Sequence, residues 1–318
     1  MNNMTCRICG NSQENSLYRF KEMMYGTREE FDYFQCAKCK CLQIATVPAD
    51  LSNYYPEGYS GYIPPNDGLY KGIGGFFKKA RYKSVTIDKS LFNRMIAAVV
   101  PASKYEHLSR FNLTIDSSIL DVGCGFGRYL YPLYSFGMKQ VMGVDPFVDP
   151  ITYPNGYRVE KKYIDEVRGQ WDLIIYNHAF EHVPDPLDNL KAIEKLLKPT
   201  GHCVIRIPTV SSFAWQHYKE HWVQLDAPRH LFIHSRESIR LLAEEANLVL
   251  EDIVDDSEDF QFSVSEKYKA GYSMYEVQPG SRSYFEKKKE RFINNRKAKQ
   301  LNKMGQGDQA AFILSKKS

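Results

Sequence analysis

The segment Ile119-Leu120-Asp121-Val122-Gly123-Cys124-Gly125-Phe126-Gly127 decides the fold of this 318-residue chain. Its first four residues predict a strand, and glycine at every second position after Val122 predicts a loop. Glycine lets the backbone approach a ligand closely and adopt conformations that a side chain forbids. We expect a helix to begin near Arg128, so the segment predicts a strand, a ligand-binding loop and a helix in succession.

The spacing of the three glycines separates two classes of cofactor. A dinucleotide fingerprint requires G-x-G-x-x-G, with the pyrophosphate at the N-terminus of the helix. Here the last glycine of that fingerprint would fall at Arg128, and the observed pattern is G-x-G-x-G. The carboxylate of Asp121, within the strand, would also lie unfavourably beside a pyrophosphate. The loop is therefore expected to bind a cofactor that carries positive charge at this point.

A second apolar strand, Val141-Met142-Gly143-Val144, ends at an acid, Asp145. In a doubly wound sheet this carboxylate reaches the same crevice as the glycine loop, where it can accept both hydroxyls of a ribose. Hydrogen bonds to a charged group contribute roughly 1.5–3 kcal/mol each. A glycine loop followed by a strand-end acid therefore predicts a site for a nucleoside cofactor.

Strand-like and helix-like segments alternate from Ser117 onward, which is typical of βαβ units and a parallel sheet. The clearest predicted helices are 186–197 and 235–246. The expected strands are 119–122, 140–144, 158–160, 172–176, 203–207, 249–254 and 310–314. The order of these elements predicts an α/β fold.

Five of the seven cysteines lie within the first 41 residues. Two Cys-x-x-Cys turns separated by 26 residues offer the four sulfurs that zinc prefers, and the residues between them include short strand-like runs. A redox dithiol is the alternative, and Cys41 is either a spare thiol or an alternate ligand. We expect a small zinc ribbon whose metal ligands are Cys6, Cys9, Cys36 and Cys39.

The composition excludes several classes of protein. Hydrophobic residues make up 43% and charged residues 25% of the chain, a balance typical of a folded globular protein. The longest apolar run, near 95–100, is far shorter than the roughly 20 residues of a membrane-spanning helix. The N-terminus also lacks the basic and apolar regions of a secretory signal. We therefore expect a cytoplasmic protein, in which reduced cysteines are available for metal binding.

Positive charge is concentrated near the C-terminal end of the chain. Residues 281–304 contain nine Lys or Arg and two Glu, although the net charge of the whole chain is only +4. Such a run is typical of a solvated surface, and the alternative is contact with a polyanion such as nucleic acid.

Three regions follow from these patterns. Residues 1–47 are expected to form the zinc-ribbon-like domain, residues 48–116 a tyrosine-rich connector and helical region, and residues 117–318 the α/β domain. The apolar pattern from Phe76 to Val99 predicts a helix packed on the α/β domain. Because lysines and an arginine interrupt this pattern, a helix on a membrane surface is the alternative.

Later segments give the chain a family likeness. From about Ser117 to the C-terminus the sequence resembles the class I S-adenosylmethionine-dependent methyltransferases. The segment 225–231 and the segment 305–309 resemble a subgroup found in surface-saccharide gene clusters. The likeness beyond the glycine loop is carried by 171–186, with its Glu181-His182-Val183-Pro184-Asp185 run, and by Leu196-Leu197-Lys198-Pro199-Thr200-Gly201, in which Thr200 replaces the family's glycine.

The resemblance implies a Rossmann-like, seven-stranded sheet whose last strand is antiparallel. It also implies that the three glycines face the methionine part of S-adenosylmethionine, that Asp145 binds the ribose, and that Tyr163 and Ile164 flank the adenine. The expected cofactor-binding residues are Asp121, Gly123, Gly125, Gly127, Asp145, Tyr163, Ile164 and Asn177.

Methyl transfer from a sulfonium is an in-line displacement that needs alignment rather than a covalent nucleophile. A hydroxyl or amine acceptor must also lose a proton, and a placed base accelerates that step by roughly 10²–10⁴. Histidine suits this task because its ordinary pKa is about 6.5. The candidates are His178, Glu181, His182, His221 and His230, with His178 and His182 ahead. Arg229 is expected either to bind an anionic group together with His230 or to bond a loop to the core.

The leading functional prediction is a methyltransferase that acts on a sugar, either nucleotide-linked or within a surface-polysaccharide precursor. A ribosomal-RNA methyltransferase is the second hypothesis, supported by the basic residues 281–304. A zinc-dependent interaction protein whose methyltransferase-like domain has no activity is the third. The intact glycine loop and its two acids argue against the third.

Overall fold

We describe a computed structural model of the chain over residues 4–56, 60–66, 68, 72–86, 91, 95, 103–278 and 283–317. The chain divides into two compact units, each assembled from separated stretches of sequence. The cysteine unit comprises Met1–Pro56, Phe180–Lys191 and Ile205–Lys317, and the glycine-loop unit comprises Glu57–Ala179 and Ala192–Val204.

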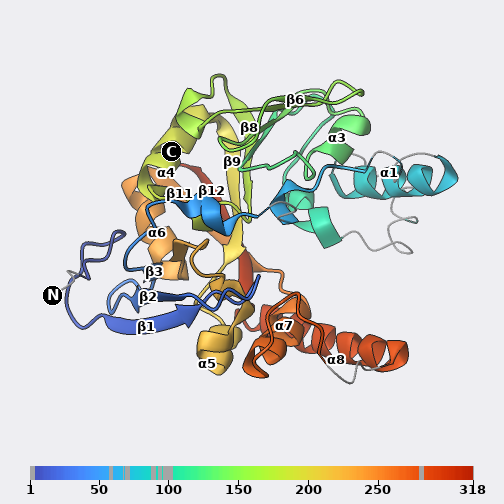
Figure 1. Cartoon of the computed structure of the whole chain (residues 1–318). Helices are drawn as coiled ribbons and strands as arrows, with labels where there is room; N and C mark the ends of the chain where they lie inside the picture. Colours follow the sequence, from blue (N-terminus) through green and yellow to red (C-terminus); the bar gives the residue numbers. More distant parts are fainter. Residues whose placement is uncertain are drawn as a thin grey trace. The chain divides into compact units, whose positions relative to one another are not determined.

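The glycine-loop unit is built on a mostly parallel sheet (Figure 1). Its strands are hydrogen-bonded in the order β9-β8-β4-β5-β7-β6. Strand β4 is parallel to β5 and β8, and β5 is parallel to β7, whereas the short β6 is antiparallel to β7. Strand β4 is wholly buried and so are the four central residues of β8, as a parallel sheet covered on both faces requires. The strands are β4 (Ile119–Val122), β5 (Val141–Val144), β6 (Ile151–Thr152), β7 (Arg158–Glu160), β8 (Trp171–Asn177) and β9 (Leu197–Pro208), which continues into the cysteine unit.

The helix after the glycine loop begins at Tyr131 and not near Arg128, so that prediction was wrong. Consecutive turns connect Gly127 to Tyr131, whose N–H donates to the carbonyl of Gly127. Pro132 follows directly, and proline fits an α-helix only in its first turn. The helices whose bounds lie in the described part of this unit are η2 (Ser60–Tyr62), α1 (Gly72–Thr86), η4 (Ser103–Arg110), α3 (Tyr131–Ser135) and η5 (Ile164–Glu166).

Helix α1 is packed within the glycine-loop unit along part of its length. The ring of Tyr82 lies 5.0 Å from that of Tyr105 in η4 and 5.4 Å from that of Phe136. Ile73 and Phe76, near its other end, remain exposed. The predicted helical pattern continued to Phe92, Ile96 and Val99, which lie outside the described residues.

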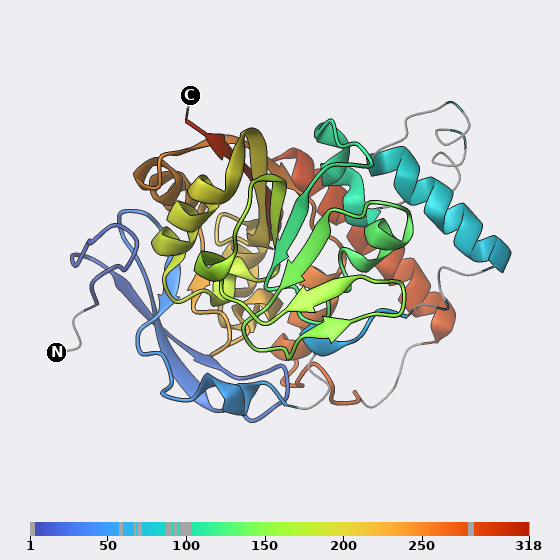
Figure 2. The same cartoon turned by 90° about the horizontal axis from the view of Figure 1, so that it is seen from above.

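A four-stranded antiparallel sheet lies in the cysteine unit, in the order β1-β2-β3-β10. Figure 2 shows the long β1–β2 hairpin in blue. Strand β10 pairs with β3 through Phe232↔Gln43 and Ile233↔Leu42, so a segment after residue 230 completes a sheet begun near the N-terminus. The strands are β1 (Ser16–Lys21), β2 (Glu30–Gln35), β3 (Leu42–Ile44) and β10 (Phe232–Ile233).

The remaining strands of the cysteine unit extend from β9 in the order β11-β12-β9. The last strand of the chain, β12 (Gln309–Lys316), is antiparallel to β11 (Leu248–Asp255). The helices are η1 (Leu51–Tyr54), η6 (Phe180–His182), α4 (Pro186–Leu196), which crosses into the glycine-loop unit, α5 (Phe213–Tyr218), η7 (Lys219–His221), η8 (Val223–Leu225), α6 (Arg236–Glu245), α7 (Phe260–Lys269) and α8 (Tyr284–Lys303).

These strands confirm the predicted fold class, a mostly parallel α/β sheet with an antiparallel last strand. The whole sheet, in the order β11-β12-β9-β8-β4-β5-β7-β6, contains the seven predicted strands. The additional strand is β6, which has two residues. An antiparallel sheet accompanies the N-terminal cysteines, as expected of a zinc ribbon.

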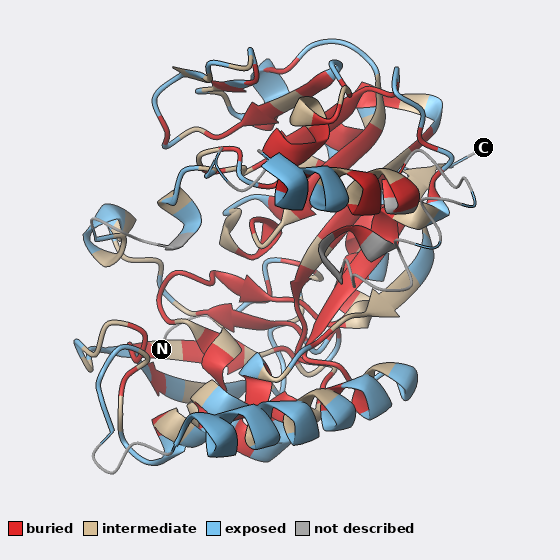
Figure 3. Ribbon diagram, turned by 90° about the vertical axis from the view of Figure 1, so that its right-hand side faces the viewer, coloured by how far each residue is buried: buried red, intermediate tan, exposed pale blue. Residues whose placement is uncertain are grey.

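Helix α8 contains most of the predicted basic segment and is exposed along most of its length (Figure 3). Ser281 and Arg282 of that segment lie outside the described residues. None of the helices in the described part of the chain is long and apolar enough to cross a membrane.

Candidate functional site

The glycine loop is folded onto the end of β5. Strands β4 and β5 are parallel neighbours, with Val122 opposite Val144. The N–H groups of Gly123 and Cys124 donate to the carbonyl of Val144 at 2.9 and 3.2 Å, and the N–H of Gly125 donates to Asp145 Oδ2 at 2.9 Å. The loop and the strand-end acid therefore meet at the carboxyl edge of the sheet, where open α/β sheets bind ligands.

Each of the three glycines has a positive φ, of 68°, 53° and 72° in chain order. A Cβ at Gly123 would lie 2.5 Å from Ala179 Cβ, and one at Gly127 would lie 2.5 Å from Tyr157 Cε1. Both glycines are thus required because other parts of the unit pack against the loop. A Cβ at Gly125 would instead lie 2.2 Å from the carbonyl oxygen of Gly61.

The short helix η2 therefore lies against the middle of the loop. The ring of Tyr62 is 5.8 Å from that of Phe126. The close approach of Gly61 shows that the surface over Gly125 admits a main-chain or ligand atom where no side chain fits. A ligand bound over Gly125 and the segment 60–62 in this position would compete for the same surface.

The two acids of the loop create a negative potential around it. Asp121 is 2% exposed and Asp145 is 5% exposed. Burial raises the pKa of the Cys124 thiol well above its usual value, and the charges of Asp121 and Asp145 raise it further. Burial, with a contribution from Asp145, raises the pKa of Tyr62 to about 12. The potential disfavours added negative charge and favours a cation, so the residues fit a nucleoside that carries a sulfonium.

The segment that follows β8 lies beside the loop through the contact of Ala179 with Gly123. Asn177 ends β8, and His178 adopts an unusual backbone conformation with a φ of 54°. Both side chains are half-buried. Left-handed backbone at a non-glycine residue is uncommon and is often found at functional sites.

The residues expected to flank an adenine follow β7. Tyr163 is 59% exposed and precedes η5, whereas Ile164 is 5% exposed and belongs to the packed interior. Tyr163 thus presents its ring to solvent, while Ile164 contributes to the core.

Four cysteine sulfurs form one group in the cysteine unit. The Sγ–Sγ distance is 3.6 Å for Cys6 and Cys39 and 3.5 Å for Cys9 and Cys36, and all four atoms lie within 4.8 Å of one another. Four sulfurs bound tetrahedrally to zinc at about 2.3 Å lie about 3.8 Å apart. Gln43 Nε2 donates to Cys6 Sγ at 3.1 Å, as outer residues do at metal sites. The group fits a structural zinc ion.

Cys41 lies outside the four-sulfur group. Its side chain is fully buried, and its Sγ lies 3.7 Å from the carbonyl oxygens of both Leu42 and Ile233, to either of which the thiol can donate. Burial raises the pKa of this thiol well above its usual value, which opposes the thiolate form that binds metal. The structure therefore assigns Cys41 to the packing of β3 against β10.

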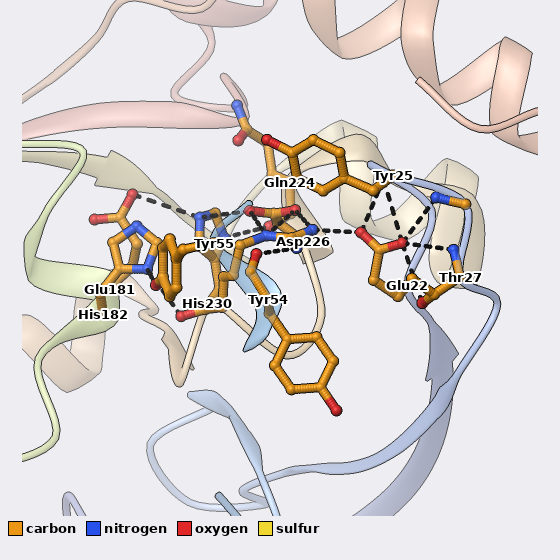
Figure 4. Close-up of polar contacts among 12 residues, drawn as sticks. Glu22, Tyr25, Thr27, Tyr54, Tyr55, Glu181, His182, Gln224, Asp226 and His230 are labelled. Carbon is orange, nitrogen blue, oxygen red and sulfur yellow. Dashed lines mark hydrogen bonds and ion pairs between the residues drawn. The ribbon is translucent and has the colours of Figure 1, made fainter. Parts of the chain in front are cut away.

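Three of the predicted catalytic residues form a second group in the cysteine unit, shown in Figure 4. His182 Nδ1 lies 2.8 Å from the carbonyl oxygen of Arg229, and His230 Nδ1 lies 2.8 Å from that of Gln224. His230 Nε2 lies 3.8 Å from Glu181 Oε1, and the two imidazole rings are 4.8 Å apart. His221, in η7, instead faces Glu220 at 3.7 Å.

Arg229 is enclosed by acids that the sequence analysis did not select. It is 1% exposed, and its Nη2 donates to Asp226 Oδ1 and to Glu22 Oε1, both at 2.6 Å. Glu22 also accepts the N–H groups of residues 25–27 at 2.8–3.2 Å. Burial alone would raise the pKa of Asp226, but the charge of Arg229 lowers it below its usual value. Arg229 therefore bonds the loop to the core, the second of its two predicted roles.

The chain is similar to known proteins over part of its length. A family model described as a methyltransferase domain matches residues 89–253. The ubiquinone biosynthesis O-methyltransferase of Serratia proteamaculans is 29% identical over 120 residues, which are 34% of this chain and 49% of that protein. The enzyme of the same name from Acinetobacter baumannii is 33% identical over 97 residues, 26% of this chain and 40% of that protein. The matches thus span half or less of these relatives.

Solved structures are similar at lower identity. A methyltransferase from Thermotoga maritima, described as S-adenosylmethionine-dependent and a possible histamine N-methyltransferase, is 19% identical. The match covers 64% of this chain and 83% of that one, with a TM-score of 0.39. Because the family model spans more than half of the sequence, the chain belongs to the class I S-adenosylmethionine-dependent methyltransferase family.

Proposed function

We propose that the chain transfers a methyl group from S-adenosylmethionine to a hydroxyl oxygen of a small molecule, with a sugar as the leading acceptor. The observation that carries the proposal is the glycine loop, with Asp121 in β4 and Asp145 directly after the parallel neighbour β5. When bound, S-adenosylmethionine supplies a methyl group already activated by a positively charged sulfur. Two buried carboxylates beside the loop favour that charge.

The roles of the binding residues follow from this arrangement. Asp145, oriented by the amides of Gly125 and Phe147, would accept the ribose hydroxyls. The methionine part would lie along Gly123, Gly125 and Gly127, with Tyr163 and Ile164 near the adenine and Asn177 at the adjoining strand end. Binding over Gly125 requires the segment 60–62 to move away from it.

We assign the role of general base to His178. It directly follows β8, in the segment that packs on the glycine loop through Ala179. An imidazole there would accept the proton of the acceptor hydroxyl as the new bond to the methyl carbon forms. Glu181, His182 and His230 are the alternative candidates for the base, and they contact one another within the cysteine unit.

The four-sulfur group would hold zinc as a structural ion. Tetrahedral coordination by Cys6, Cys9, Cys36 and Cys39 stabilises a segment too small to form a large core. The site requires reduced thiols, which the proposed cytoplasmic location provides.

Two acceptor classes have separate support. The subgroup resemblance of 225–231 and 305–309 favours a sugar hydroxyl in a surface-polysaccharide pathway. The names of the relatives favour a hydroxyl of a ubiquinone precursor as the second candidate.

The test is transfer of radiolabelled methyl from S-adenosylmethionine to fractionated nucleotide sugars and, in parallel, to hydroxylated ubiquinone precursors. We expect transfer to one acceptor class, and a 10²–10⁴-fold lower kcat in His178→Asn with an unchanged KM for the methyl donor. The matched control is His202→Asn, a half-buried histidine of the same unit that packs on Phe111. Failure of the full chain to bind S-adenosylhomocysteine in a calorimetric titration would overturn the proposal.

A further inference from the structure

Glu181, His182 and His230 each hold one potential ligand atom close to those of the other two. These atoms all lie within 4.8 Å of one another, and the separation of His230 Nε2 from Glu181 Oε1 is 3.8 Å. Bonds of 2.0–2.2 Å around a tetrahedral ion place ligand atoms about 3.4 Å apart. A contraction of up to about 1.4 Å between the most distant of these atoms would therefore produce a coordination sphere.

Both imidazoles are held in the tautomer that a metal ligand needs. A carbonyl oxygen only accepts hydrogen bonds, so the contacts to Arg229 and Gln224 place a proton on Nδ1 of His182 and of His230. A ring that carries its single proton on Nδ1 presents a lone pair at Nε2. Donation from the other ring nitrogen to a carbonyl is the usual way in which proteins orient metal-binding histidines.

The charges around the group also favour a cation. The carboxylates of Glu22 and Glu181 are fully buried, and that of Asp226 is largely buried. The guanidinium of Arg229 forms ion pairs with Asp226 and Glu22. His230 Nε2 lies 3.8 Å from Glu181 Oε1 and 3.8 Å from Asp226 Oδ2. A cation bound at His230 Nε2 would therefore lie close to two buried carboxylates, which favour positive charge nearby.

We propose that Glu181, His182 and His230 bind a divalent transition-metal ion, independently of the four-cysteine site. Two imidazole nitrogens and one carboxylate oxygen are a donor set that suits zinc and iron(II) and differs from the four sulfurs of the cysteine group. Three protein ligands leave a coordination position open. His182, which is half-buried, is the ligand nearest to solvent.

Cobalt(II) is a suitable probe because its absorption spectrum distinguishes sulfur from nitrogen and oxygen ligands. The full-length chain, treated with a mild chelator and then saturated with zinc at the cysteines, is titrated with cobalt(II). We expect one cobalt ion per chain in addition to one zinc, without the charge-transfer bands of thiolate ligands. Glu181→Gln and His230→Gln are expected to weaken cobalt binding by about 100-fold or more.

The matched controls are Glu220→Gln and His221→Gln, a carboxylate and an imidazole that face each other in the same unit away from the group. Neither is expected to change cobalt binding. Thermal unfolding without cobalt shows whether each variant is folded. Should the wild-type chain take up no cobalt beyond the cysteine site, Glu181 and His230 form an imidazolium–carboxylate pair instead, and the proposal is overturned. Undiminished binding in folded Glu181→Gln and His230→Gln overturns it equally.

Discussion

Buried carboxylates in the two units have different partners. Asp145 of the glycine-loop unit accepts the amides of Gly125 and Phe147, which orient the carboxylate without neutralising it. Asp226 of the cysteine unit accepts a guanidinium, that of Arg229, which compensates its charge. A carboxylate held by amides is suited to a cationic ligand, whereas one held by arginine connects parts of the fold. Changes in the cysteine unit should therefore cost stability, and changes at the glycine loop should cost ligand affinity.

Loss of the proposed zinc ion is the strongest test of this contrast. Cys39→Ser removes one of four ligands and is expected to forfeit a large part of the roughly 10–16 kcal/mol with which small zinc modules hold their ion. Elemental analysis should show loss of zinc, and hydrogen exchange should show faster exchange in β1, β2 and β3. The control is Cys41→Ser, a buried thiol outside the four-sulfur group. Equal loss of zinc in the two variants would contradict the ligand set.

Arg229→Leu should have the next largest effect on stability. It leaves Glu22 and Asp226 buried without their guanidinium, so the free energy of unfolding should fall by about 3–5 kcal/mol in urea denaturation. Arg240→Leu breaks two exposed pairs on helix α6 and should cost less than about 1 kcal/mol. If the two variants lost similar amounts of unfolding free energy, the buried ion pairs of Arg229 would have no special structural role.

Acid should weaken the cysteine unit through His234, which lies between the rings of Phe180 and Phe232. Burial lowers the pKa of His234 from 6.5 to about 3. Since its pKa is lower in the folded state, the unfolded chain takes up the proton first, and stability present above pH 6.5 is lost as the pH falls. The expected loss between pH 6.5 and pH 4 is about 3 kcal/mol.

His234→Phe should flatten this dependence when urea denaturation is followed across the same pH range. His217→Gln, at an exposed position of α5, should leave it unchanged. A wild-type slope that persists in His234→Phe would assign the acid sensitivity to other groups.

The smallest effect is expected at the glycine loop and concerns binding. Asp145→Asn removes a charged acceptor of the ribose hydroxyls, so the affinity for S-adenosylhomocysteine should fall by 1.5–3 kcal/mol, or about 10- to 150-fold. Isothermal titration measures this change directly. Asp149→Asn alters an exposed acid that pairs with Lys161 and should leave the affinity within about twofold. An unchanged affinity in Asp145→Asn would separate the loop from the cofactor.

The features that the sequence predicted well are contiguous in the chain. The strands β4 and β7 have the expected bounds, because each is a short run between turn-forming residues. The helix after the loop was placed too early because glycine and arginine alone do not show where the turns end, whereas Pro132 does. The two residues of β6 are too few to form a recognisable pattern.

The parts of the site that escaped prediction depend on distant residues. Glu22 and Arg229 are separated by 207 positions in the sequence. No sequence pattern marks Glu22, an acid before the turn at 25–27, as the partner of a distant arginine. The spacing of Asp226 and Arg229 was the available hint of an ion pair. The position of Gly61 against Gly125 likewise follows from packing, since a glycine in a tyrosine-rich connector carries no signal of its neighbour.

The pairing of β3 with β10 has a consequence for synthesis on the ribosome. About 190 residues separate the two strands, so translation at 5–20 residues per second leaves β3 without that neighbour for roughly 10–40 s. An exposed strand edge during this interval invites pairing with other nascent chains. All four zinc-binding cysteines emerge before β3 does. The ion can therefore stabilise the β1–β2 hairpin early, before β10 has been synthesised.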